Sequence, residues 1–175
     1  AEVMLMEALG QDGATALIQQ DRFRNAIITA RSKGIARGSD GVPLLAGMTM
    51  AMVLNALSRR NLELLFDRIV FCHEELEEVP FTPGFNTQRV ALDKHNLIPA
   101  LKASGAIPLL IRCEDSISGA PRGPYWDGGI IDYHFTLASN TRPGLVLYPH
   151  FHKQLTAGWF DKALRWRTRE APALD

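Results

Sequence analysis

The sequence predicts an α/β layered fold with a largely parallel central sheet. Two short runs, RNAIITAR at 24–31 and DRIVFCH at 67–73, stay apolar over consecutive central positions, as strands buried on both faces do. A longer helix-forming stretch separates them, and glycine and proline gather before it. Strands that alternate with helices in this way are typical of a sheet whose faces are covered by helices.

The elements before residue 74 follow from local composition. A helix is expected over the first 20 residues, interrupted at 10–13, where two glycines flank Gln11 and Asp12. We then expect a strand at 24–31, a glycine-rich loop up to Pro43, a helix at 44–66 and a second strand at 67–73.

The elements after residue 73 are shorter. Four glutamates and two prolines predict an exposed link at 74–83. Asn96 can cap a helix that tolerates Pro99 in its first turn and ends at Gly105. We also expect strands at 88–92, 108–113, 124–131 and 145–148, and a closing amphipathic helix at 157–168.

The composition is that of one ordinary globular domain spanning residues 1–175. The 19 basic and 19 acidic residues give a formal net charge of zero. Such a balance argues against binding to nucleic acid, which depends on clustered lysine and arginine. One mildly basic cluster, Arg165, Arg167 and Arg169 beside Trp159 and Trp166, favours a solvated helix face, with membrane or phosphate contact as the alternative.

The cysteines and the apolar runs predict neither a metal centre nor a membrane span. Cys72 and Cys113 lack metal-ligand spacing and are expected to be buried thiols. No run approaches the roughly 20 apolar residues of a transmembrane helix, and no signal segment opens the chain. We expect a cytoplasmic location, with peripheral membrane contact left open.

The stretch GPYWDGGIIDYH, at 123–134, contains the first candidate for catalysis. Asp127 precedes Gly128 and Gly129 at an expected strand end, so little side-chain bulk would keep a nucleophile or substrate away from its carboxylate. Partial desolvation would raise its pKa toward the range of a general base. The alternative is a simple turn, because Asp-Gly is a common turn dipeptide, and spacing alone favours the turn.

The histidines near the C-terminus give a competing hypothesis. His150 and His152 have the i, i+2 spacing that places both rings on one face of a strand. With His134 and either Asp132 or Asp127 they could bind zinc and support a metal-dependent hydrolase. The pattern is weak, because histidines next to a proline are more often surface or hydrogen-bonded residues.

A serine nucleophile for Asp127 is not apparent in the sequence. The G-x-S-x-G elbow is absent, and the nearest fragments, at 38–41 and 103–105, have the wrong spacing. Ser104 is expected at the end of a helix before a capping glycine. Cys72 and His73 are adjacent, so on a strand they would point to opposite faces, and we interpret the pair as structural.

Three alternating methionines follow the glycine-rich loop. Met48, Met50 and Met52, with Leu54, could line a lipid-accepting groove, because methionine adapts to irregular apolar ligands. A spacing of two does not keep side chains on one helix face, however, so core packing is favoured.

Two segments together resemble the patatin-like phospholipases. LKASGAIP at 101–108 is similar to that family's A-S-x-A-I-P segment, and YWDGGIID at 125–132 is similar to its aromatic-x-D-G-G turn. The resemblance covers about residues 86–135. It implies a three-layer α/β/α fold and lipid acyl hydrolysis by a Ser-Asp dyad, with Asp127 as the base and Gly128 and Gly129 shaping its turn.

The same resemblance has two departures. The family's glycine-rich oxyanion segment and its G-x-S-x-G elbow have no counterpart here. We expect the chain to be the C-terminal part of a longer hydrolase, because it begins with Ala1 and enters a helix directly; a non-catalytic module that binds lipid or a protein is the alternative. The expected substrate is a lipid or small ester, and no cofactor is expected.

Overall fold

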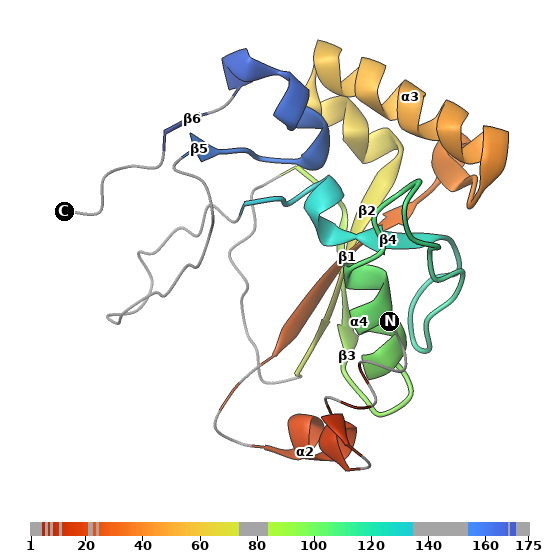
Figure 1. The fold of residues 1–175 in the computed structure, drawn as a ribbon, viewed down its shortest axis with the longest axis vertical. Helices are drawn as coiled ribbons and strands as arrows, with labels where there is room; N and C mark the ends of the chain where they lie inside the picture. The colour runs from red at the N-terminus through yellow and green to blue at the C-terminus, as the bar shows by residue number, and fades with distance from the viewer. Residues whose placement is uncertain are drawn as a thin grey trace.

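The computed structural model describes residues 5, 7, 9–10, 12–20, 23, 25–73, 84–134, 154–167 and 169–170 (Figure 1). The α-helices are α2 (Gly13–Gln19), α3 (Gly41–Leu57) and α4 (Leu97–Ser104). The strands are β1 (Ala26–Ser32), β2 (Phe66–Cys72), β3 (Thr87–Ala91), β4 (Tyr125–Asp127), β5 (Gln154–Leu155) and β6 (Arg169–Glu170). Short 3-10 helices are η1 (Gly34–Arg37), η2 (Arg59–Leu64), η3 (Gly128–Ile130), η4 (Trp159–Ala163) and η5 (Arg165–Arg167).

The main sheet has the strand order β3-β2-β1-β4. β2 and β3 are parallel, whereas β1 is antiparallel to both of its neighbours. The predicted α/β content is therefore confirmed. The predicted largely parallel sheet is wrong for these four strands, because only one of their three pairings is parallel.

The path between β1 and β2 explains this correction. Ser32, the last residue of β1, lies opposite Phe66, the first residue of β2, so the chain leaves and re-enters the sheet at the same end. In between, α3 contacts both η1, which follows β1, and η2, which precedes β2. The helical segment therefore leaves the sheet and returns to the same end. The sequence pattern predicts a helix between two strands. It contains no signal for the end of the sheet at which the chain re-enters after that helix.

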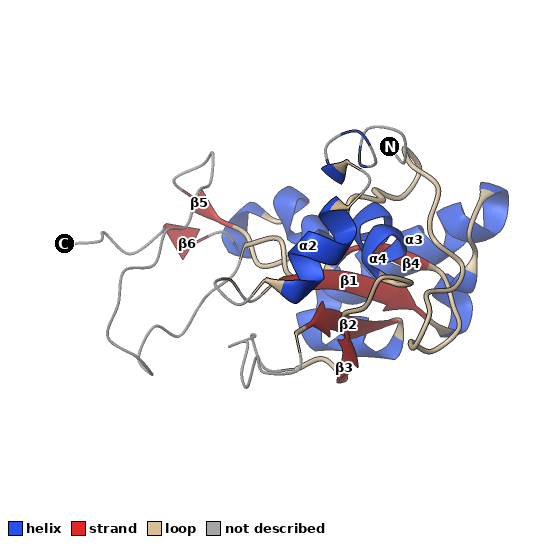
Figure 2. Cartoon of the chain, turned by 90° about the horizontal axis from the view of Figure 1, so that it is seen from below, coloured by secondary structure: helices blue, strands red, loops and turns tan. Residues whose placement is uncertain are grey.

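Hydrophobic side chains pack on both faces of the sheet. On one face Ala30, Phe66 and Trp126 belong to a buried cluster with side chains of α3 and η4, and Figure 1 shows these two segments side by side at the top of the molecule. On the other face Phe71 and Tyr125 belong to a cluster with side chains of α4 and α2. Figure 2 shows α2 and α4 on the same side of β1. Alternation of side chains along each strand separates the two clusters.

Several predicted boundaries need correction. The helix expected at 44–66 is α3 followed by η2, with extended Ser58 between them. The strand expected at 108–113 is instead a turn-rich loop before an isolated bridge between Glu114 and Tyr125. The helix expected at 157–168 is two short 3-10 segments, η4 and η5.

Long-range contacts explain why the segment expected to be a helix at 157–168 forms two 3-10 helices instead. The carboxylate of Asp161 is buried and accepts hydrogen bonds from Asn55, Arg59 and Arg167. These partners come from α3, η2 and η5, so tertiary structure rather than local helix propensity sets the backbone here. The predicted link at 74–83 and the predicted strand at 145–148 lie outside the described residues.

The cysteines are buried free thiols, as predicted. Burial, with the nearby charge of Asp115, raises the pKa of the Cys113 thiol to about 12, so this thiol stays protonated at neutral pH. His73 next to Cys72 bonds to the N-terminal part of the chain: its ring accepts the N–H of Asn25 at 3.0 Å. Both observations agree with the structural interpretation of the pair at 72–73.

The methionines of α3 differ from one another. Met48 is buried in the core, whereas Met50 and Met52 are exposed. Leu54 is partly buried against the same core, so the prediction of core packing is right for Met48 and Leu54 and wrong for Met50 and Met52. Within the described ranges, no helix has both the length and the apolar character that crossing a membrane requires.

Candidate functional site

Asp127 is the last residue of β4, at the edge of the main sheet. On one side it lies opposite Thr29 of β1. On the other side its backbone N–H donates to the carbonyl oxygen of Ala106 at 3.0 Å. The two segments that carry the patatin-like resemblance, 101–108 and 125–132, are therefore hydrogen-bonded to each other.

The backbone turns immediately after Asp127, in η3. One carboxylate oxygen of Asp127, Oδ1, accepts the backbone N–H of Gly129 at 2.7 Å. The carbonyl of Gly128 accepts the N–H groups of Ile131 and Asp132, at 3.1 and 2.8 Å. This network holds the carboxylate in one orientation, so Asp127 is both a turn residue and a fixed functional group.

Close packing explains the two glycines. A β-carbon at Gly128 would lie 2.6 Å from the carbonyl oxygen of Ile28 in β1. A β-carbon at Gly129 would lie 3.0 Å from Oδ1 of Asp127 itself. Neither glycine has a positive φ. Close approach of the β1 backbone therefore requires glycine at position 128, whereas a β-carbon at position 129 would crowd the Asp127 carboxylate that Gly129 borders.

Gly128→Ala should destabilise the fold by about 1–3 kcal/mol, the usual range for an overpacked site, because the nearest atoms include the backbone carbonyl of Ile28 in a central strand. Urea unfolding monitored by circular dichroism measures the change. Gly105→Ala is the matched control, because a β-carbon there would meet only the carbonyl oxygen of Lys102, at 3.9 Å. Equal losses in the two variants would contradict this packing account.

The environment of Asp127 favours its protonated form. Burial raises the pKa of this carboxyl above its usual value of 3.8, and the hydrogen bond from Gly129 and the charge of Lys162 oppose that rise without cancelling it. The Lys162 ammonium lies 3.7 Å from the centre of the Tyr133 ring, which holds it near the turn. A carboxylate with a raised pKa accepts a proton more readily, as a general base must.

The raised pKa predicts how Asp127→Asn changes stability. The folded state binds the proton more tightly than the unfolded chain, so the stability that this carboxyl contributes is present below the unfolded pKa and is lost as the pH rises through the folded pKa. An amide does not ionise and can accept the same N–H. Thermal unfolding should therefore show a higher melting temperature for the variant at about pH 7 and no difference at about pH 3. A variant less stable than the parent at neutral pH would contradict the raised pKa.

Asp132 and His134 do not join Asp127 in a metal site. The carboxylate of Asp132 accepts two hydrogen bonds from the guanidinium of Arg68, at 2.6 and 2.7 Å, and both side chains are buried. The ring of His134 accepts the backbone N–H of Thr156 at 2.9 Å. No group of three or more metal-ligand side chains gathers in the part of the chain that the structure describes. His150 and His152 lie outside that part.

Ser104 has the position that the sequence predicts for it. It is the last residue of α4, its hydroxyl donates to the carbonyl of Leu101 at 2.8 Å, and Gly105 follows as the cap. Pro108 is buried just beyond the hydrogen bond between Ala106 and Asp127. Both residues therefore belong to the scaffold next to the candidate base.

Sequence reasoning missed the arginines that support the turn. Arg68 binds Asp132, and the Arg59 guanidinium donates to the carbonyl of Ile131. Both guanidinium groups also lie over the ring of Phe85, at 5.3 and 5.4 Å from its centre. One signal was present, since Asp67 and Arg68 are charged residues at the start of a buried strand, and a buried charge requires a partner.

Comparisons of this chain with models of protein families, with curated proteins and with solved structures gave no match. Among the candidate residues, Asp127 has the best-defined surroundings for catalysis. Its carboxylate is partly buried and is fixed at the end of a strand.

Proposed function

We propose that this chain supplies the general base of a serine-dependent lipid acyl hydrolase, with Asp127 in that role. The observation that carries the proposal is the carboxylate of Asp127, which is oriented by the N–H of Gly129 and has a raised pKa. Its hydrogen bond to Ala106 adds support, because it joins the two segments that resemble the patatin-like phospholipases.

In each half of the proposed cycle, Asp127 accepts one proton and then returns it. Because Oδ1 holds the N–H of Gly129, Oδ2 is the atom that would take the serine proton as the serine oxygen attacks the ester carbonyl. The proton then passes to the departing alcohol, leaving an acyl-serine. Water releases the acid in the second half of the cycle, with Asp127 again accepting and returning a proton.

The serine and the oxyanion donors would come from outside these 175 residues, because the chain contains no G-x-S-x-G elbow. The same observation favours a second candidate function, a non-catalytic module of patatin-like fold that binds a lipid or a protein. Without oxyanion donors a base alone gives little rate acceleration. The two candidates therefore differ in whether a reactive serine accompanies Asp127.

The experiment uses the polypeptide encoded by the complete reading frame that contains these residues, called the reading-frame product below. It is treated with a fluorophosphonate, which reacts with activated serines, and the labelled peptide is identified by mass spectrometry. The hydrolase proposal expects one labelled serine and slower labelling in Asp127→Asn. A product that acquires no label would remove the hydrolase proposal and favour the binding module.

A further inference from the structure

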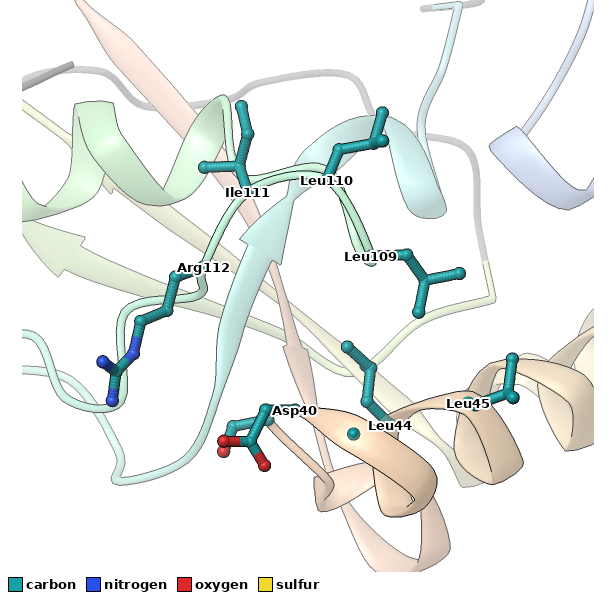
Figure 3. Close-up of a pocket in the computed structure, with 9 residues that line it drawn as sticks. Asp40, Leu44, Leu45, Leu109, Leu110, Ile111 and Arg112 are labelled. Atoms are coloured by element: carbon teal, nitrogen blue, oxygen red, sulfur yellow. The ribbon is translucent and has the colours of Figure 1, made fainter.

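A groove lies between the start of α3 and the loop that follows Pro108 (Figure 3). Its walls are aliphatic, and its volume of about 450 Å³ is within the usual range for small-molecule sites. Asp40 and Arg112 are its charged residues, and none of the nine residues that line it is aromatic. Leu44 and Leu45 line it from α3, and Leu109, Leu110 and Ile111 line it from the loop; the side chain of Leu109 extends toward α3, whereas those of Leu110 and Ile111 point away from it (Figure 3).

From these features we infer that the groove holds the acyl chain of the ester substrate. The inference rests on the proposed function, because it places the chain relative to Asp127. A linear hydrocarbon fits walls that offer methyl and methylene groups and no ring to stack on. Two charged side chains, Asp40 and Arg112, line the groove beside its five aliphatic residues.

The loop on one side of the groove is attached to the strand that bears Asp127. Its start is fixed where the carbonyl of Ala106 accepts the N–H of Asp127 at 3.0 Å. Its end is fixed where Glu114 and Tyr125 exchange two backbone hydrogen bonds, at 3.2 and 2.8 Å. The groove-lining residues Leu109 to Arg112 lie between these two points, and Leu109 follows Ala106, the hydrogen-bond partner of Asp127, by three positions.

The tip of this loop has a backbone conformation that is unfavourable for the residue found there. Leu109 has a φ of 69°, and no other non-glycine residue in the described ranges has a positive φ. A leucine in this conformation is strained, and such strain is retained most often at functional sites. In Figure 3 its side chain extends from the loop toward α3, where Leu44 and Leu45 lie.

The opposite wall is also unusual for a surface helix. α3 has 17 residues, and its sequence GVPLLAGMTMAMVLNAL contains no charged side chain. Its inner side packs on the core through residues that include Leu44 and Met48, while Leu45 is 54% exposed. A helix that is apolar on both sides needs an apolar contact on its outer side. An acyl chain in the groove provides that contact at the N-terminal end of α3.

The test compares short and long esters in the reading-frame product. Leu45→Trp fills the groove, so kcat/KM for a dodecanoyl ester should fall about tenfold, which corresponds to about two methylene groups losing contact. kcat/KM for a butanoyl ester should stay unchanged. The matched control is Leu57→Trp, which lies on the same helix, is 75% exposed and does not line the groove.

Equal effects of Leu45→Trp on both esters, or none on either, would overturn the acyl groove and leave the hydrolase proposal standing. Displacement of a fluorescent fatty acid by dodecanoate gives a readout that needs no turnover. If the product hydrolyses no ester, the proposed function fails, and this displacement still decides the groove: weaker binding in Leu45→Trp than in Leu57→Trp supports it, and equal binding contradicts it.

Discussion

Asp127→Asn should lower kcat/KM for a butanoyl ester by about 10²–10⁴-fold in the reading-frame product, the usual contribution of a positioned general base. The amide keeps the shape of the side chain and can still accept the N–H of Gly129. It cannot accept the serine proton, so the loss should appear in the chemical step rather than in folding. Steady-state ester hydrolysis measures the effect.

A matched control separates catalysis from a general loss of charge. Asp12→Asn removes a carboxylate at the start of α2, where the side chain is exposed and makes no capping hydrogen bond. Hydrolysis by this variant should equal that of the parent. If Asp127→Asn hydrolysed the ester as fast as Asp12→Asn does, Asp127 would have no part in the mechanism.

Asp132→Asn should destabilise the fold by about 3–5 kcal/mol, because it removes a buried carboxylate charge that binds the buried guanidinium of Arg68. Urea unfolding measures this loss. The matched control is Glu114→Gln in the more exposed pair with Lys102, which should change stability by at most about 1 kcal/mol. Equal losses in the two variants would contradict a special role for the buried pair.

The same pair holds the turn that carries the candidate base. Asp132 donates its backbone N–H to Gly128 and fixes its carboxylate on β2, so the pair ties the end of the turn to the middle of the sheet. The double variant Arg68→Met with Asp132→Leu removes both charges and should recover much of the stability lost in Asp132→Asn. Failure to recover would show that hydrogen bonds and ring contacts of Arg68, rather than its charge, determine the loss.

The sequence predicted the features that depend on neighbouring residues. The strands β1, β2 and β3 and the helix α4 lie within one or two residues of their expected bounds, because apolar runs and caps are local signals. The strand expected at 124–131 is shorter, because β4 ends at Asp127 and η3 follows. Of the two glycines that the sequence places after this carboxylate, Gly129 lies against it in the structure.

The features that the sequence did not predict depend on residues far apart in the chain. Arg68 and Asp132 are separated by 64 positions, and Asn55 and Asp161 by 106. Nothing in the spacing of these residues indicates that they pair. The predicted direction of the strands was wrong for a similar reason. The path of the chain from β1 to β2 depends on the packing of α3 against η1 and η2 and not on local preference.

The pH dependence of kcat/KM for a butanoyl ester tests the role of Asp127 most directly. A base with a raised pKa should give an acidic limb whose midpoint lies above 3.8, because activity is lost as Asp127 takes up a proton. The residual activity of Asp127→Asn should lack this limb. The same limb in the variant, at the same midpoint and with an undiminished plateau, would contradict the assignment of Asp127 as the general base.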